Sequence, residues 1–444
     1  MMRRLPLSFC KYAGLPLLIA FCGCAHYRPN PLPTAPDFEK TPELTVPAKQ
    51  FWLPGLAPHR ISAQGLDVTT VMTLAVFNNP DLKAARLQAG VAGAQMLEAG
   101  LLPDPELDAN FATSPLNYGG VLGLSEQIQA LITRGAAEAA AKHAAQQVNL
   151  DILWQEWQVA ERARELFIQA RADEQLQNVF ASTRSLLEDR YHRDQAAMER
   201  GDETAGIVAA DLNALVDADT SLRQLQTQVN INGHALNALL GLDPEVKLHL
   251  IGPPAAPALT KEEFEQAVAS LPRRRADLLA LQAGYQSQEE NLRRAVLAQF
   301  PAMNAGVEFE RDSVEGVNAV GPQVSMSLPI FNRNRGQIAI QKATRELLRQ
   351  TYQARLDAAQ SQADEVWKAA EIMEGQLRDL DAQLPLLDKT ATAARQSLQE
   401  YNVNAPLYIS LESNLLAKRA EAIRLEASLE SARCALNTLL GLPL

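Results

Sequence analysis

Histidine and cysteine are the residue types with which this chain could perform catalysis or bind a metal, and their spacing fits neither role. No two of the six histidines stand at the helical spacing of a zinc site; they are His26, His59, His143, His192, His234 and His249. The chain also has no glycine-rich phosphate loop and no Gly-x-Ser-x-Gly elbow. We therefore expect a protein that is not an enzyme and that has no cofactor and no metal site.

One cysteine has a context that indicates chemistry. A basic start precedes a short apolar stretch, 15–21, and Gly23 stands just before Cys24. This order is typical of an export signal, and Phe21-Cys22-Gly23-Cys24 resembles the cleavage site of a lipoprotein signal. The resemblance implies a signal peptide over residues 1–23 and lipidation of Cys24, for example with palmitate. An ordinary cleaved signal peptide is the alternative.

The remaining cysteines form no disulfide framework. Cys10 and Cys22 would leave with the signal, and Cys434 would remain alone. No later stretch supplies the ~20 uncharged apolar residues of a spanning helix. A mature chain that touches a bilayer would do so through acyl chains or strands.

Composition favours long helices and argues against nucleic acid. The 444 residues carry a formal net charge of −11, whereas a nucleic-acid groove needs a cationic surface. The chain is 47% hydrophobic but only 5% aromatic, which is typical of helices packed through small side chains.

The chain repeats itself after a Pro-rich segment, 24–65, that we expect to be extended. The stretch 235–242, ALNALLGL, returns as 435–442, ALNTLLGL, at an offset of 435 − 235 = 200 residues. Three shorter matches, between residues 79–135 and 275–336, have offsets from 196 to 201. We expect a tandem duplication with units of 66–255 and 256–444.

Each unit contains two stretches in which apolar and polar residues alternate. After a first helix, expected over about 68–101 and 261–299, the alternation runs through 107–113 and 303–310. Second strands follow at about 119–127 and 323–328. The pattern predicts strands with one apolar face, of the length that crosses an outer membrane.

The strands lead into long helices. From 348 to 401 small or apolar residues recur at spacings of three and four, which indicates a coiled-coil seam; Pro385 should kink or interrupt it. The first unit has a similar segment, about 136–200. Turn signals at 200–202 and 402–406 precede a returning helix that ends in the repeated motif.

Four amphipathic strands cannot close on themselves, because the smallest outer-membrane barrels have about eight. If they enter a membrane, several chains must share one barrel, since unpaired backbone groups are costly in hydrocarbon. A small soluble sheet that caps a helical bundle is the alternative.

At this point the residues resemble the outer membrane factor family, the TolC-like efflux channels. The resemblance is carried by the duplicated plan, Asn79-Pro80-Asp81-Leu82, Phe300-Pro301, the segment 327–336 and the two motif ends. It implies a mainly α fold with a small β part: duplicated helical hairpins form an α-barrel, and four strands per chain join a shared transmembrane β-barrel. It further implies a homotrimer in the outer membrane of a Gram-negative bacterium that extends into the periplasm.

The resemblance also implies partners and sites. The partners are a periplasmic adaptor (membrane fusion) protein, an inner-membrane pump of the RND type, and outer-membrane lipid, with metal cations or drugs as cargo. The segment 329–336 looks more like the heavy-metal-cation branch. The implied adaptor contacts at the hairpin tips are Arg200, Gly201, Thr204, Asn404, Pro406 and Leu407. The candidate aperture residues are Ser410, Glu412 and Ser413, and the strand-to-helix junctions are Arg134, Gly135, Pro329, Arg333, Arg335 and Gly336. A periplasmic adaptor or coiled-coil scaffold lipoprotein without a pore is the alternative function.

Overall fold

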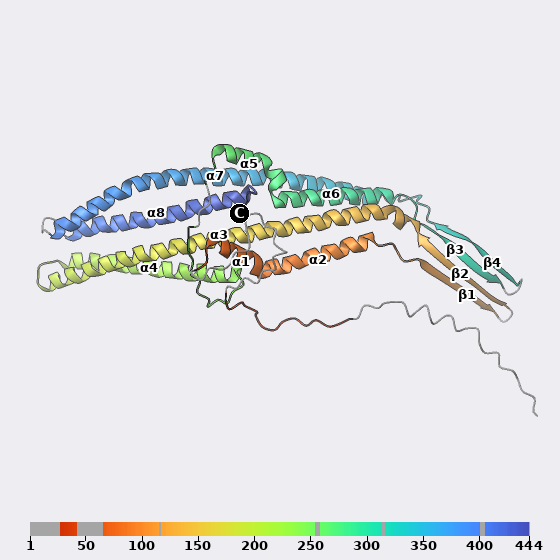
Figure 1. Ribbon diagram of the computed structural model, residues 1–444, viewed down its shortest axis with the longest axis horizontal. Helices are drawn as coiled ribbons and strands as arrows, with labels where there is room; N and C mark the ends of the chain where they lie inside the picture. Colours follow the sequence, from red (N-terminus) through yellow and green to blue (C-terminus); the bar gives the residue numbers. More distant parts are fainter. Residues whose placement is uncertain are drawn as a thin grey trace, which may run out of the picture. The chain divides into compact units, whose positions relative to one another are not determined.

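The computed structural model describes residues 27–41, 65–114, 117–253, 258–312, 316–399 and 405–443. The chain divides into one unit up to Phe38 and a second from Glu39 onward. In the first, residues 27–38 carry neither helix nor strand; the predicted signal peptide, 1–23, lies outside the described residues. The second unit contains α1 (Val68–Asn78), α2 (Pro80–Gly100), β1 (Glu106–Ser114), β2 (Asn117–Gln127), α3 (Ile128–Glu199), α4 (Ala205–Leu239), α5 (Lys261–Arg274), α6 (Ala276–Leu297), β3 (Met303–Asp312), β4 (Val317–Met326), α7 (Arg335–Gln399) and α8 (Ala405–Leu439) (Figure 1).

The order of elements is the same in the two halves of this second unit. Two helices lead to a β-hairpin, and the hairpin leads to a long helix and a shorter returning helix. The strands lie at one end of this unit, and the end of α3, the start of α4, the end of α7 and the start of α8 lie at the other (Figure 1). With 72 residues in α3 and 65 in α7, each long helix is on the order of 100 Å long at ~1.5 Å per residue. The repeated order agrees with a duplication, whose boundaries at 66–255 and 256–444 stay a prediction.

The four strands form one antiparallel sheet in the order β1-β2-β3-β4. Its centre joins the two halves, because β2 pairs with β3. The register places Leu107 opposite Leu124 and Leu124 opposite Val307, so these side chains share a face. The exposed large apolar side chains on this face are Leu107, Phe111, Leu122, Leu124, Val307, Phe309, Val320, Val324 and Met326, and the exposed Arg311 also lies on it. The predicted amphipathic strands are confirmed, and their apolar face is open.

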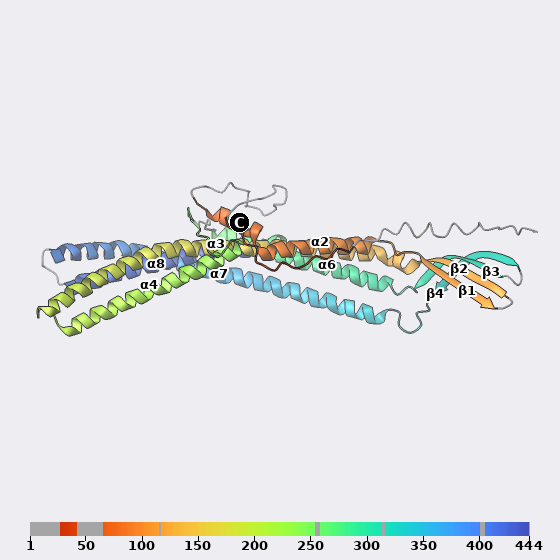
Figure 2. The ribbon, with the colours of Figure 1, turned by 90° about the horizontal axis from the view of Figure 1, so that it is seen from below.

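The sheet and the helical layer beside it both end in open edges. β1 and β4 are outer strands, and each pairs on one side only among the described residues. Next to the sheet the helices pack in the order α2, α3, α6, α7, and nearer the hairpin turns in the order α4, α3, α8, α7. Figure 2 shows α2 and α7 on opposite sides of α6. One edge therefore consists of β1, α2 and α4, and the other of β4 and α7.

Two equivalent apolar cores hold the middle of the helices. In the first, α1 and Trp157 of α3 pack against Leu236 and Leu240. In the second, α5 and α7 pack against Leu436 and Leu440. The repeated motif therefore supplies the end of the returning helix to each core.

Glycines of the motif allow a close approach there. Gly241 and Gly441 have φ values of +66° and +65°, the left-handed conformation that ends helices. A Cβ atom on Gly241 would lie 2.7 Å from the carbonyl oxygen of Asn78, and one on Gly441 would lie 3.1 Å from the carbonyl carbon of Arg274. Each returning helix thus ends against the break between two shorter helices.

The residue at each break donates a hydrogen bond to the end of the returning helix. Asn79 Nδ2 donates to the Leu239 carbonyl at 3.2 Å. In the second half Arg275 Nη1 donates to the Leu439 carbonyl at 3.3 Å. The same contact is therefore made by two different side chains.

These breaks correct the sequence prediction of single helices over about 68–101 and 261–299. Asn79 caps α2 and Pro80 occupies its first turn, which ends α1; Arg275 is extended between α5 and α6. Strand β4 also begins earlier than predicted, because it pairs along the length of β3. Pro385 lies inside α7 without interrupting it; Figure 1 shows α7 curving gradually.

Candidate functional site

The first hairpin turn is closed by a left-handed glycine. Arg200 ends α3, and Gly201, with φ +82°, donates its N–H to the Met198 carbonyl at 2.9 Å. Arg200 is exposed and pairs with Asp202 at 3.2 Å. Thr204 precedes α4, and its carbonyl accepts from Val208. The turn presents polar and charged side chains at the end of the molecule farthest from the sheet (Figure 1).

The second hairpin begins its return with Pro406 and Leu407, in the first turn of α8, where Leu407 is exposed. Asn404 lies outside the described residues. The end of α7 and the start of α8 lie at the same end of the unit as the first turn (Figure 1). Their role in contacting a partner stays a prediction.

The candidate aperture residues follow on α8. Ser410 is exposed and Ser413 is half-buried. The Glu412 carboxylate accepts from Arg395 Nη2 at 3.1 Å and is only 11% exposed. Arg395 Nε also donates to the Tyr408 hydroxyl at 3.1 Å. In this chain Glu412 therefore joins α8 to α7, and its role at an aperture stays a prediction.

A buried pair of carboxyl groups near the first turn was missed by the sequence analysis. Asp211 of α4 is 2% exposed, and its Oδ1 lies 2.6 Å from Arg190 Nε of α3, while Asp194 Oδ2 lies 3.6 Å from the same nitrogen. Burial, followed by a hydrogen bond with Asp194, raises the pKa of Asp211 to about 6. The three residues are scattered in sequence, and only the pairing of α3 with α4 brings them together.

A buried charge cluster, also missed, lies at the second helix break. Arg275 is 1% exposed, donates to Asp277 Oδ1 at 2.8 Å and lies 4.8 Å from the ring of Trp154. Asp277 Oδ2 accepts from Arg355 at 2.6 Å. Burial lowers the pKa of Arg275, and the Asp277 carboxylate opposes that shift. The cluster joins α6 and α7 to α3 of the other half.

The strand-to-helix junctions differ between the halves. β2 runs directly into α3, where Arg134 Nε donates to the Gly100 carbonyl at 2.7 Å and Gly135 is helical. After β4 a loop precedes α7. In that loop Arg333 and Asn334 are left-handed, with φ 46° and 54°, and Asn334 Nδ2 donates to the Ala295 carbonyl at 2.7 Å.

The loop after β4 is largely exposed. Arg333, Arg335 and Gly336 are exposed, and Pro329 is half-buried. A cavity of about 660 Å³, lined by Arg134, Arg294 and Asn334 among others, lies at this level between the helices. The predicted junction residues thus lie around the base of the sheet, and their function stays a prediction.

The second face of the sheet is acidic. The register places Asp108 opposite Gly123, and Gly123 opposite Glu308, so the two carboxylates lie on one face. Glu106 and Glu310 share it by the same alternation. Glu106 accepts from Gln127 Nε2 at 2.7 Å. Among the described strand residues no Lys, Arg or His occupies this face, since Arg311 alternates onto the apolar side.

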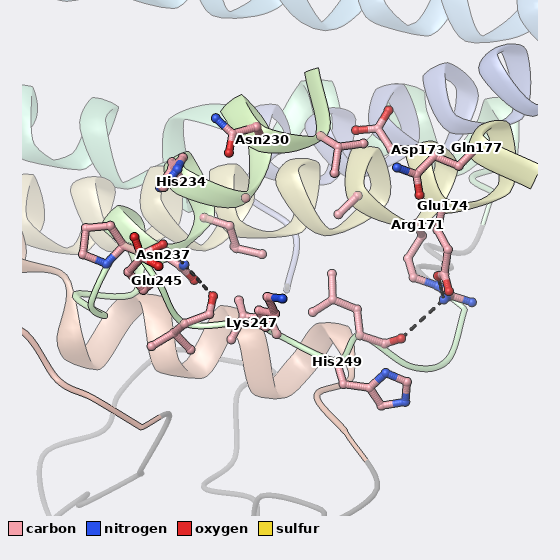
Figure 3. Close-up of a pocket in the computed structure, with 18 residues that line it drawn as sticks. Arg171, Asp173, Glu174, Gln177, Asn230, His234, Asn237, Glu245, Lys247 and His249 are labelled. Carbon is pink, nitrogen blue, oxygen red and sulfur yellow. Dashed lines mark hydrogen bonds and ion pairs between the residues drawn. The ribbon is translucent and has the colours of Figure 1, made fainter. Parts of the chain in front are cut away.

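A cavity of about 590 Å³ with a mixed polar and apolar lining lies between α3, α4 and the segment that follows α4 (Figure 3). Figure 3 shows hydrogen bonds that hold this segment in place: Asn237 donates to the Val246 carbonyl at 2.8 Å, and Arg171 to the Leu250 carbonyl at 3.3 Å. His234 and His249 also line the cavity. In the described part of the chain no three His, Cys, Asp or Glu residues gather to hold a metal ion.

Cys24, the candidate for lipidation, lies outside the described residues. Cys434 is fully buried, and burial raises its pKa to about 11, so it is a poor nucleophile.

No helix in the described ranges contains a stretch that is long and apolar enough to cross a membrane.

The chain has the fold of solved outer-membrane channels. CusC, whose crystal structures concern folding and transmembrane channel formation, matches with a TM-score of 0.68 at 16% identity, over 92% of this chain and 99% of CusC. The outer-membrane channel OprN matches with a TM-score of 0.70 at 15% identity, over 94% and 99%. The outer membrane protein VceC of Vibrio cholerae matches with a TM-score of 0.69 at 16% identity, over 84% and 96%. No family model and no curated protein matches the sequence.

Proposed function

We propose that this chain is a protomer of an outer-membrane channel of the TolC-like family, a passive duct for the efflux of small solutes. The sheet is the observation that carries the proposal. It has one exposed apolar face, one acidic face and two open edges, in a chain that has the fold of solved outer-membrane channels. Such a sheet suits a wall between lipid and water once its edges are paired.

Closing these edges requires further copies of the chain, and three are the best number. Two copies would supply eight strands, and a barrel of about eight strands is just wide enough for its own side chains. With four strands per chain, three copies supply twelve and leave a passage. We therefore propose a homotrimer, with head-to-tail contacts that close a ring.

The helical edges support such a ring, because each carries exposed apolar side chains at helical spacing. On α2 these are Leu87 and Val91, four residues apart, and on α7 they are Ile340 and Leu347, two turns apart. A seam at spacings of three and four residues buries well against a second helix. The copies would then enclose an α-barrel continuous with the strands.

The acidic face would line the passage, while the apolar face would contact lipid. Carboxylates without basic neighbours favour cations over anions in the pore. Cationic solutes, including metal cations or basic drugs, are the cargo that this lining fits best. The duct needs no resident metal, because conduction requires only that solutes pass.

The helical hairpins support the proposed partners. The described ends of their helices lie at the end opposite the sheet (Figure 1), where they would face the periplasm. We propose that they dock a periplasmic adaptor protein coupled to an inner-membrane pump of the RND type. Among the described residues, the Arg200–Asp202 pair and Leu407 are exposed at this end.

We also propose that Cys24 is acylated and anchors the chain to the outer membrane. The support is the export signal that precedes it. Cells grown with radioactive palmitate should label the parent protein but not Cys24→Ser. Persistent label in the variant would contradict the anchor and leave the channel proposal intact.

The channel proposal is tested by reconstituting the purified protein in planar bilayers. We expect large, stepwise conductance. A matched preparation that was heat-denatured before reconstitution is the control. A particle that is monodisperse and single-copy without detergent, and that never conducts, would instead indicate a scaffold lipoprotein without a pore.

A further inference from the structure

The loop between β4 and α7, residues 327–334, combines exposed apolar side chains with a basic surrounding. Residues 316–345 carry four basic side chains and no acidic one, although the formal net charge of the chain is −11. In the loop Leu328, Ile330 and Phe331 are 66%, 65% and 87% exposed. We infer that this loop binds anionic phospholipid, with its apolar side chains among the acyl chains and its arginines at the phosphates. The inference rests on the proposed function, because it requires the sheet to enter a membrane.

The loop continues the apolar face of the sheet. On β4 this face ends with the exposed Met326, and positions 328 and 330 follow in the same alternation. The N–H of Ser327 still donates to the Ala302 carbonyl at 2.9 Å, as in a continuing strand. Strand side chains stand perpendicular to the sheet, whereas a further strand would add in its plane. Leu328 and Ile330 therefore suit a lipid surface better than a neighbouring strand.

The length of β4 places the loop at the boundary of the bilayer. A transmembrane strand needs about 9–11 residues, and β4 has 10. If β4 crosses the hydrocarbon, the residues after it lie at the level of the headgroups, on the side of the helices. Figure 2 shows the loop between the end of β4 and the start of α7. Phe and Leu side chains bury favourably at the boundary between headgroups and acyl chains.

Basic side chains follow directly after the apolar ones. Arg333 and Arg335 are exposed, and Arg335 Nη2 donates to the Phe331 carbonyl at 3.1 Å. This contact uses one N–H of a guanidinium group that has five, and guanidinium groups bind phosphate oxygens through paired hydrogen bonds. The exposed Lys342 lies seven residues after Arg335, on the same side of α7. An anionic leaflet attracts such a cluster.

The loop holds this arrangement in a conformation that its residues disfavour. Arg333 and Asn334 have φ values of 46° and 54°, the left-handed region that is unfavourable for residues with a Cβ atom. The Asn334 side chain fastens the loop to α6, because it donates to the Ala295 carbonyl at 2.7 Å. Strained backbone of this kind persists where the surrounding structure holds it, often at ligand-binding positions.

The first half of the chain has no such loop. There β2 ends at Gln127 and α3 begins at Ile128. In the second half Pro329 follows the strand, and a proline disfavours helical conformation in the residue before it. The exposed apolar loop is thus a feature of the second half alone among the described residues.

Quenching by brominated lipid tests whether lipid reaches the loop. Phe331→Trp places a fluorophore there, and the signal of the parent, which has four tryptophans, is subtracted. The full chain is reconstituted in phosphatidylcholine vesicles that contain equal fractions of brominated phosphatidylglycerol or brominated phosphatidylcholine. We expect both lipids to quench Phe331→Trp, and the phosphatidylglycerol to quench several-fold more strongly. Ile330→Trp should behave alike, which protects the test against one poorly folded variant.

The matched control is Ile372→Trp. Ile372 is 62% exposed on α7, on the order of 50 Å from the loop at ~1.5 Å per residue, so neither lipid should quench it. Adding Arg333→Gln and Arg335→Gln to Phe331→Trp should remove the preference for phosphatidylglycerol while quenching by both lipids remains. High salt should weaken the preference in the same way.

The outcomes separate this inference from the proposed function. Conducting protein in which neither lipid quenches Phe331→Trp or Ile330→Trp would show that another copy of the chain covers the loop, and the channel would stand. Equal quenching by the two lipids before the arginines are changed would overturn the binding of anionic lipid. Single-copy protein that never conducts would instead overturn the channel proposal itself.

Discussion

At the scale of single residues, the two motif glycines decide how each helical hairpin returns to the middle of the molecule. Gly241 and Gly441 take left-handed φ values and touch backbone at Asn78 and Arg274. A side chain there would meet both a backbone clash and an unfavourable φ. The repeated motif is therefore a structural joint, which explains why the chain carries it twice.

We predict that Gly241→Ala lowers the stability of the protein by about 2 kcal/mol, since a left-handed non-glycine residue costs about 1–2 kcal/mol and the Cβ also contacts the Asn78 carbonyl. The midpoint of urea unfolding, followed by far-UV circular dichroism, measures it. Gly233→Ala is the control: it lies inside α4 with open space around it, and alanine should be neutral or stabilising. Equal midpoints for Gly241→Ala and the parent would contradict the role of the joint.

The Asp194–Asp211 pair should make the first hairpin sensitive to pH. Burial and the hydrogen bond with Asp194 raise the pKa of Asp211 from 3.8 to about 6. Between these values the folded state keeps a proton that the unfolded chain releases, so this stabilisation is fully present below pH 3.8 and is lost as pH rises through about 6. Arg190 of α3 and Glu203 in the turn are the other charged groups facing Asp211.

Asp211→Asn should remove this dependence, because an amide imitates the protonated carboxyl while Asp194 still faces Arg190. We expect the midpoint of thermal unfolding to rise by about 2 °C at pH 7.5 and to match the parent at pH 4.5. Asp217→Asn, an exposed position on the same helix, should have no effect at either pH. A loss of stability in Asp211→Asn that is equal at both pH values would show that the ion pair with Arg190 outweighs the shared proton.

At the scale of elements, the sheet combines an apolar face, which suits lipid, with an acidic face, and the long helices extend away from it. The side chains of Leu107 and Phe111 point one way and those of Asp108 and Glu308 the other. Because strand side chains alternate, a shift of one residue in register would exchange the two faces. The pairing of β2 with β3 is thus the contact that fixes both surfaces.

Neutralising the acidic face should reduce cation selectivity several-fold. The variant combines Glu106→Gln, Asp108→Asn, Glu308→Gln and Glu310→Gln, which keeps shape and removes charge. The reversal potential across a gradient of potassium chloride measures the ratio of cation to anion permeability. The salt concentrations must be low, because salt screens the charge of the carboxylates. Glu262→Gln with Glu265→Gln on α5, outside the sheet, is the control. An unchanged reversal potential would mean that this face does not line the passage.

Periodicity predicted most of these elements, and the failures have physical causes. Alternation found β1 and β3 because their faces differ strongly, but the start of β4, Val-Asn-Ala-Val-Gly-Pro, has small or apolar residues on both faces, so only its pairing with β3 reveals it. The helix break at Asn79-Pro80 was missed, although a capping residue followed by proline also signals the start of a new helix. Local sequence does not show that Arg275 is buried, because Trp154 beneath its guanidinium comes from α3, and Arg355, which shares the Asp277 carboxylate with it, comes from α7.

At the scale of the whole molecule, the described residues leave both edges of the sheet and both edges of the helical layer open. Exposed apolar side chains lie along these edges. In an assembled ring these edges would be buried, the acidic face would enclose water, and the hairpin turns would form a rim for a periplasmic partner. The stability of the strands is therefore expected to depend on assembly, since a four-stranded sheet with an uncovered apolar face gains little by itself.

The most direct measurement of this account is an image of the protein in a lipid nanodisc by single-particle electron microscopy. The account predicts three chains around one open passage, with β1 to β4 inside the bilayer and the helical hairpins extending from one side of it. A single chain per particle, with no passage and with the strands outside the bilayer, would contradict it.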